Sequence, residues 1–97
     1  MAAVAFSRAA WSDLDRLADF LRESRPELAE DTGRLILEAV AVLQDHPLIG
    51  RPIEDGFRVL LISRGRSGYI AVYKYREVDD QMTVHRIRHQ REAGFDE

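Results

Sequence analysis

Residues 45–56, DHPLIGRPIEDG, divide the chain into two parts with different hydrophobic patterns. The stretch holds two prolines and two glycines, so it favours irregular structure over a helix or a strand. Before it, apolar residues recur at intervals of three and four, as on one face of a helix. After it, runs rich in β-branched and aromatic residues alternate with turn signals. We therefore expect a helical layer from the first part and a sheet from the second.

The chain begins with a predicted strand and an amphipathic helix. Ala2–Phe6 is short and apolar, which is typical of a strand, and Ser7 occupies an N-cap position. The pattern predicts a helix over Ser7–Glu23 that leaves its charged side chains, Asp13 among them, mostly on the outer face. Its apolar face consists of Ala10, Trp11, Leu14, Leu17, Ala18 and Leu21.

A second helix follows at once. Pro26 suits the first helical turn, and an apolar stripe continues to about Asp45. Gly33 either weakens this helix by about 1 kcal/mol or lets the two helices approach closely. Because the link between the helices is short, we expect an antiparallel helical hairpin.

The second part predicts three strands, Phe57–Ser63, Tyr69–Arg76 and Met82–His89, separated by turns at residues 65–68 and 77–81. The resulting order β-α-α-β-β-β predicts an α+β fold. In it, the helical hairpin packs on one face of a small antiparallel sheet. With 97 residues, the chain is expected to form a single domain, 1–97.

Composition excludes several classes of protein. The chain is 45% hydrophobic and 32% charged, as globular proteins are. It has no cysteine, which excludes a disulfide scaffold, a thiolate zinc site and a cysteine nucleophile. No apolar run approaches the ~20 residues of a membrane-spanning helix, and the N-terminus lacks the pattern of a signal peptide. We expect a cytoplasmic protein with no membrane partner.

The charges are segregated along the chain. Residues 1–47 carry five arginines against nine acidic residues, a balance of −4. Residues 56–91 carry seven arginines and one lysine against three acidic residues, a balance of +5. The planar arginine side chain suits bidentate contact with phosphate or carboxylate. The second part is therefore the candidate for contact with an anionic partner.

Neither of the last two strands has a wholly apolar face, so the pattern does not tell which face is the core. Alternation places Tyr69, Tyr73 and Tyr75 on one face, while Ile70 and Lys74 share the other. A β-bulge or two partly covered faces would produce this mixture. The arginines and tyrosines either line a surface that grips an anion or stacks on bases, or serve as core edges and partners of local acids.

The sequence offers little for metal or cofactor chemistry. His85 and His89 lie four residues apart, which on a strand separates them by about 13 Å, too far to share one ion. A single histidine acting as general acid or base stays open. We expect no metal and no cofactor.

Five segments together resemble the RelE/ParE superfamily of toxins from type II toxin–antitoxin modules, over essentially the whole chain. They are SRAAWSDL (7–14), DHPLIGRP (45–52), FRVL (57–60), SGYIAVYKY (67–75) and VHRIRHQREAGF (84–95). The resemblance implies a small α+β fold and a cognate antitoxin whose C-terminal part wraps the helices and sheet. RelE-like members cut mRNA on the ribosome, whereas ParE-like members poison DNA gyrase.

This sequence departs from the RNA-cutting pattern. It has Ile70 where that branch has an arginine and Leu60 where it has a second lysine, although Arg58 suits the first basic position. Phe95 replaces a C-terminal tyrosine, and only Arg91, followed by Glu92, fits a basic catalytic position clearly. Other RNA-cutting members use Glu and His instead, which keeps Glu92 and the two strand histidines open for that chemistry.

The resemblance implies a ParE-like toxin that stabilises a plasmid or chromosomal segment by inhibiting DNA gyrase, without catalytic turnover. The alternatives are a ribosome-dependent mRNA endoribonuclease, with His85, His89 and Arg91 as catalytic residues, and a non-toxic relative that still binds an antitoxin. The expected binding surface consists of Arg58, Tyr73, Tyr75, Arg86, Arg88, His89 and Arg91.

Overall fold

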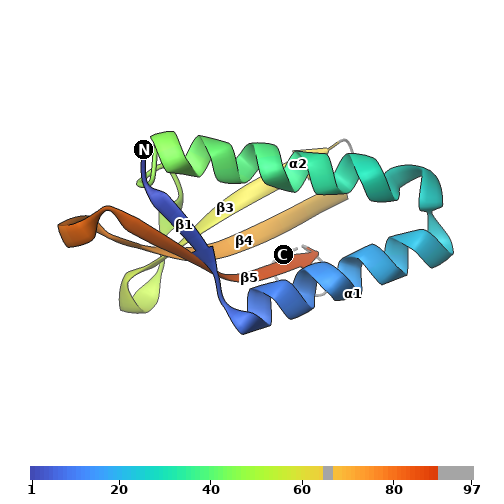
Figure 1. Cartoon of the computed structure of the whole chain (residues 1–97), viewed down its shortest axis with the longest axis horizontal. Helices are drawn as coiled ribbons and strands as arrows, with labels where there is room; N and C mark the ends of the chain where they lie inside the picture. The colour runs from blue at the N-terminus through green and yellow to red at the C-terminus, as the bar shows by residue number, and fades with distance from the viewer. Residues whose placement is uncertain (65–66, 90–97) are drawn as a thin grey trace.

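The computed structural model describes residues 1–64 and 67–89, with backbone only at 28, 63, 64 and 67. These residues form two α-helices and five strands; four of the strands follow the expected order and the fifth, a short one, is not expected from the sequence (Figure 1). This arrangement confirms the α+β fold with a helical layer on a sheet. The elements are β1 (Ala3–Phe6), α1 (Arg8–Ser24), α2 (Pro26–Asp45), β2 (Arg51–Pro52), β3 (Phe57–Arg64), β4 (Ser67–Arg76) and β5 (Gln81–His89).

The sheet has the strand order β1-β5-β4-β3-β2 and is mixed rather than wholly antiparallel. Strands β3, β4 and β5 pair antiparallel, as expected, and the unexpected β2 pairs antiparallel with β3. Strand β1 runs parallel to β5 and pairs from Ala3 opposite Gln81 to Phe6 opposite Val84. Because β1 and β5 come from opposite ends of the chain, no hairpin turn dictates their relative direction.

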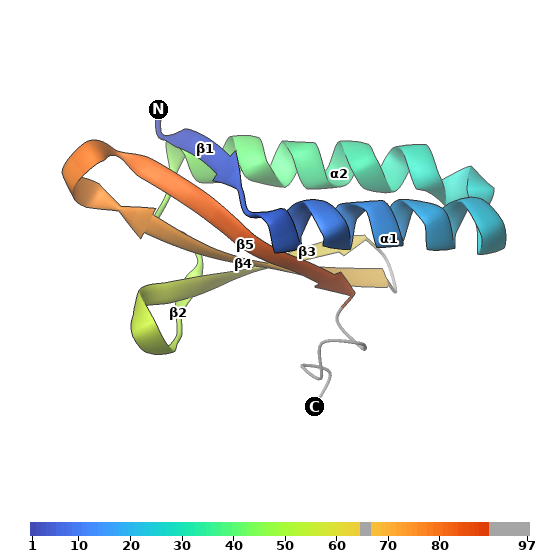
Figure 2. The same cartoon turned by 60° about the horizontal axis from the view of Figure 1, so that its bottom comes forward.

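Both helices lie on one side of the sheet, and the turn between β2 and β3 projects on the other side (Figure 2). Ser7 caps α1, since its Oγ accepts a hydrogen bond of 3.0 Å from the Ala10 N–H. The single residue Arg25 links the helices, which confirms the hairpin. Gly33 has no atom within 4 Å of the place where a Cβ would lie, so the idea that it lets the helices approach closely is wrong. Neither helix of the described chain combines the length and apolar composition that crossing a bilayer requires.

The core lies between the helices and the inner sheet face. Eleven buried residues form one cluster, contributed by α1, α2 and the three long strands. They are Ala10, Leu17, Ile36, Leu43, Ile62, Tyr69, Ala71, Tyr73, Met82, Val84 and Ile87.

The stretch after α2 is more ordered than expected from its prolines and glycines. Arg51 pairs with Val59 and Pro52 with Arg58, which adds β2 as a short edge strand. Asp55 and Gly56 close this hairpin with φ of 62° and 81°. Positive φ at two successive residues is the requirement of a type I′ turn, for which Asp-Gly is a preferred sequence. The expectation of wholly irregular structure over 45–56 is therefore wrong at its second half.

A β-bulge in β5 explains the mixed faces of the last two strands. Val72 pairs with Arg86, but the next residue, Tyr73, pairs with Val84, so His85 has no opposite residue in β4. The bulge lets Val84 and Ile87, three residues apart, both face the core.

Helix α1 closes the edge of β5 beyond the end of β1. The Ser7 Oγ donates to the His85 carbonyl at 2.9 Å, and the Ile87 N–H donates to the Asp13 carboxylate at 2.9 Å. Arg86 adds two bonds to Asp13, of 2.8 Å from Nε and 3.1 Å from Nη2. Asp13 is only 4% exposed, so its expected place on the outer helix face is wrong. These contacts satisfy backbone groups that an open strand edge would leave unpaired.

The N-terminal end of the chain is tied to the end of α2. The Ala2 N–H donates to the Gln44 carbonyl at 2.9 Å, and the Gln44 side-chain amide donates to the Ala2 carbonyl at 3.1 Å. Ala2 is buried by these contacts.

Asp13→Ala is expected to lower the free energy of unfolding by about 1–3 kcal/mol, because it leaves the buried Ile87 N–H without an acceptor. Urea unfolding at pH 7 measures the change. Asp19→Ala removes an exposed ion pair with Arg22 on the same helix and should change stability by no more than about 0.5 kcal/mol. Equal effects of the two substitutions would contradict the clamping role of Asp13.

The same clamp predicts a pH dependence. Burial alone would raise the pKa of Asp13, but the hydrogen bonds from Arg86 and the Ile87 N–H outweigh it and hold the pKa below its ordinary value. Because the pKa of Asp13 is lower in the folded than in the unfolded chain, its ionised carboxylate contributes its full stabilisation at pH values above the ordinary carboxyl pKa of about 4. The stability difference between the wild type and Asp13→Ala should therefore shrink as the pH falls below that value.

Candidate functional site

The structure separates the expected binding residues into groups rather than one surface. Tyr75 lies near one end of β4 and Tyr69 near the other, and six residues of strand span about 20 Å. Arg58 and Tyr73 belong to the Tyr75 end, whereas His89 pairs with Tyr69. Arg91, like Glu92 and Phe95, lies outside the described residues.

The loop after α2 is held by two side chains from the sheet. The Tyr73 hydroxyl donates to the Pro47 carbonyl at 2.8 Å and accepts from the Gly50 N–H at 2.9 Å. Arg58 donates to the carbonyls of Leu48, at 3.0 Å, and Gly50, at 2.8 Å. These bonds satisfy backbone groups of a loop that, being neither helix nor strand, has no regular backbone–backbone hydrogen bonds.

Tyr73 is 0% exposed, so its expected place on the binding surface is wrong. Burial raises the pKa of its hydroxyl, although the bond from the Gly50 N–H acts in the opposite direction. The neutral hydroxyl can therefore donate and accept at once, as this loop requires. Tyr73 therefore holds the loop through its backbone and does not lie on the surface where a partner would bind.

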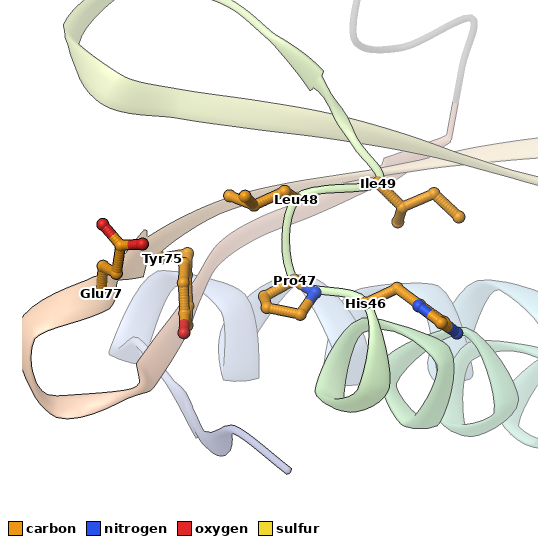
Figure 3. A pocket seen from close by; sticks show the side chains of 6 residues that line it. All are labelled: His46, Pro47, Leu48, Ile49, Tyr75 and Glu77. Atoms are coloured by element: carbon orange, nitrogen blue, oxygen red, sulfur yellow. The ribbon is translucent and has the colours of Figure 1, made fainter.

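Beside this loop lies an open hollow of about 550 Å³, which we call the Leu48 hollow. In Figure 3 the Leu48 side chain points toward Tyr75 and Glu77, whereas the side chains of His46 and Ile49 point the other way. The residues that line the hollow are His46, Pro47, Leu48, Ile49, Tyr75 and Glu77.

Tyr75 carries a short hydrogen bond at the wall of this hollow. Its hydroxyl donates to the Asp80 carboxylate at 2.6 Å. This bond, then burial, and the charges of Asp80, Glu77 and Asp79 raise the pKa of Tyr75 to about 12. Tyr75 is thus a neutral donor in an acidic surrounding.

The sheet face away from the helices carries a second group of side chains, which sequence analysis overlooks except for His85. The Lys74 Nζ lies 4.5 Å from the centre of the Phe57 ring, and the His85 ring meets that ring edge-on at 5.1 Å between centres. Burial and then the charge of Lys74 lower the pKa of His85, so its imidazole is neutral at pH 7. Cross-strand pairing of Phe57 with Lys74 brings the group together, and single-strand patterns do not reveal such a pairing.

The remaining expected residues lie along β5. Arg86 is bound to Asp13, which fits the alternative that arginines of this strand pair with local acids. Arg88 is opposite Ile70, and His89 is opposite Tyr69, with their rings edge-on at 5.5 Å between centres. Neighbouring residues point to opposite faces of a strand, so Arg88 and His89 reach different sides of the sheet.

His85 and His89 pack against different rings, Phe57 and Tyr69. Within residues 1–64 and 67–89, no group of three His, Asp or Glu side chains is arranged to hold a metal ion.

Comparisons with known proteins agree over nearly the whole chain. Residues 4–94 match the family model of the ParE toxin of the type II toxin–antitoxin system parDE. Toxin RelE3 of Caulobacter vibrioides is 35% identical over 77 residues, 79% of this chain and 82% of the relative. A structure of the chromosomal ParDE system of P. aeruginosa has a TM-score of 0.73 at 28% identity, covering 92% of this chain and 96% of that one. The RelBE2 toxin–antitoxin complex of Mycobacterium tuberculosis shares the fold, with a TM-score of 0.59 at 21% identity over 91% of this chain and 96% of that one.

The contact between the loop and Tyr73 generates a paired prediction. A Cβ at Gly50 would lie 2.6 Å from the Tyr73 hydroxyl and 2.7 Å from its ring. Because that ring is fully buried, Gly50→Ala should destabilise the protein by about 1–3 kcal/mol. Gly33→Ala meets no atom within 4 Å and should stabilise α2 by about 0.5–1 kcal/mol.

Urea unfolding of both variants beside the wild type measures these two changes. Shifts of opposite sign are expected. A Gly50→Ala variant as stable as the wild type would show that the loop does not depend on close contact with Tyr73.

Proposed function

We propose that this chain, which belongs to the ParE toxin family of type II toxin–antitoxin systems, arrests growth by poisoning DNA gyrase. Its toxicity would be neutralised by an antitoxin made from the same module, and its role would be to stabilise the plasmid or chromosomal segment that encodes both. This activity needs binding and no catalytic turnover. It places the protein in the cytoplasm, where gyrase acts.

This proposal is supported by the three sheet positions, 58, 60 and 70, at which RNA-cutting members would hold the RNA phosphates with basic side chains. Ile70, which replaces the arginine of the RNA-cutting branch, is 3% exposed. Leu60 packs against the core cluster, and Arg58 is bound to loop carbonyls. Phosphoryl-transfer catalysis depends on cations aimed at the reacting phosphate. At these three positions the chain has a buried isoleucine, a leucine packed on the core and an arginine already bonded to backbone carbonyls.

A ribosome-dependent mRNA endoribonuclease is the second candidate. The observation that favours it is the group of Phe57, Lys74 and His85, in which a neutral imidazole lies near a lysine. A neutral histidine suits general base catalysis at pH 7, and a nearby cation suits a phosphate. His89 and Arg91 are the other candidate catalytic residues. The relative of 35% identity is named Toxin RelE3, after the RelE-like branch. The test must therefore separate gyrase from mRNA as the target.

A supercoiling assay on relaxed plasmid, with gyrase, ATP and increasing amounts of the purified protein, tests the proposal. We expect loss of supercoiling together with cleaved DNA trapped on gyrase. Unchanged supercoiling by a protein that still arrests growth would contradict it, and mRNA cleavage in a purified translation reaction would then support the second candidate. His85→Gln separates the two as well. It should leave gyrase inhibition unchanged, but reduce RNA cleavage about 100-fold or more if His85 is the general base.

The basic end of β5 generates a mutational prediction. Arg88→Ala combined with Arg91→Ala should abolish growth arrest under either active mechanism, because it removes two cations from the surface proposed to contact an anionic partner. Colony counts after induction, with circular dichroism as a check of folding, measure the effect.

The matched control is Arg22→Ala combined with Arg34→Ala. Both arginines are exposed on the helices and pair with helix acids, so their loss should leave growth arrest intact. Full toxicity of a folded Arg88→Ala/Arg91→Ala variant would remove the basic end from the functional surface.

A further inference from the structure

We propose that the Leu48 hollow binds a segment of the antitoxin that presents a large apolar side chain next to an arginine or lysine. This inference rests on the toxin–antitoxin function proposed above and assigns one part of the partner's contact to one place on the chain. Four features of the described residues carry it: an apolar recess, a rigid loop, an acidic rim and a position remote from the basic end.

The hollow offers apolar surface that the fold itself does not use. Leu48 is 57% exposed and its side chain points toward Tyr75, whereas Ile49 lines the hollow and is 55% exposed, although its side chain points the other way (Figure 3). Pro47 and Tyr75 add further apolar surface to the wall. A single exposed aliphatic residue is ordinary, whereas a recess lined by several marks a site of association. A volume of about 550 Å³ accommodates one or two large side chains.

The loop that carries Leu48 and Ile49 is held in place by hydrogen bonds from side chains of the sheet. Its carbonyls at Pro47, Leu48 and Gly50 accept from Tyr73 and Arg58. The side chains that face solvent are therefore not needed to hold the loop in place. A preformed surface of this kind binds without the entropy cost of ordering a loop.

The rim of the hollow is acidic. Glu77 lines it, Asp80 bonds to Tyr75 in its wall, and Asp79 lies in the same turn. The 20-residue helix α2 ends at Asp45 beside His46 with no basic residue in its last turn, so its carbonyl end adds partial negative charge.

Two arginines lie close to this rim, but both are engaged. Arg76 is paired with Asp79, and Arg58 is bound to the loop carbonyls. Within the 76–80 turn, the three carboxylates of Glu77, Asp79 and Asp80 against the one arginine, Arg76, leave net negative charge, which complements a cationic segment.

The location of the hollow selects the antitoxin as the occupant. It lies at the Tyr75 end of β4, about 20 Å along the strand from Tyr69 and the basic end of β5. An anionic target surface or DNA would be repelled from the acidic rim and attracted to the basic end. A cationic segment has the opposite preference, so target and antitoxin would have separate anchoring places.

Leu48→Ser combined with Ile49→Ser tests the apolar contact, and Glu77→Lys tests the charge. The probe is the antitoxin encoded beside this chain, purified separately, with affinity measured by calorimetry at two salt concentrations. We expect the double variant to raise Kd by about 100-fold or more. Glu77→Lys should raise it by about 10-fold, with a weaker salt dependence.

The matched controls are Leu61→Ser and Glu23→Lys. Leu61 is 55% exposed on β3. Glu23 is next to the last residue of α1, at the end that meets the start of α2, whereas the hollow begins at His46, just after the other end of α2. Each should change Kd by less than about 3-fold. Leu48→Ala is a milder second variant, for which about a 10-fold loss is expected, should the double variant fold poorly.

Growth arrest by each variant without antitoxin separates the outcomes. Normal arrest that the antitoxin no longer rescues supports the proposal. Variants of the hollow that bind the antitoxin as tightly as the wild type does would overturn it. A folded variant that no longer arrests growth would also overturn it, whether or not it still binds the antitoxin, because the hollow would then contact the target. If the wild type neither arrests growth nor inhibits gyrase but binds the antitoxin, the proposed function fails while the affinity measurements still decide this inference.

Discussion

A buried carboxylate connects the helical layer to the sheet at the point where the sheet changes register. Asp13 accepts from the Arg86 side chain and the Ile87 backbone on either side of the peptide bond that follows the bulge. The bulge decides which of the later β5 residues face the core, so the faces of Arg88 and His89 depend on it. Among the described residues, Asp13 is the one buried acid, and it lies where an error in register would move the proposed functional end to the wrong side of the sheet.

Sequence patterns predict the local parts of this fold and miss the long-range ones. Helical periodicity and the Ser7 cap locate α1 to within about one residue, because both depend on neighbours in the chain. The Asp-Gly turn at 55–56 is also a local signal, hidden by the surrounding prolines. The partnership of Asp13 with Arg86 spans 73 residues, and no periodicity indicates it. Tyr73 is similar: its alternation with Tyr75 predicts a shared face, but the loop that buries its hydroxyl comes from 23 residues away.

For the candidate site, the sequence predicts the kind of side chains better than their positions in the fold. Segregated charge predicts that an anionic partner contacts the second part of the chain. It does not distinguish an arginine that holds a helix, such as Arg86, from one that holds a loop, such as Arg58. Once these structural arginines are set apart, the surface has two ends of different chemistry. One end of β5 carries Arg88 and His89, and the far end of β4 adjoins an acidic, apolar recess.

The double hydrogen bond between Ala2 and Gln44 has a practical consequence for anyone who handles this protein. Gln44 stands two residues before His46, so whatever is fused ahead of Ala2 leaves the molecule next to the Leu48 hollow. An affinity tag or fluorescent label at this terminus is not a neutral addition. A bulky or basic tag would compete for the recess, whereas a small environment-sensitive dye attached there would serve as a built-in sensor of its occupancy.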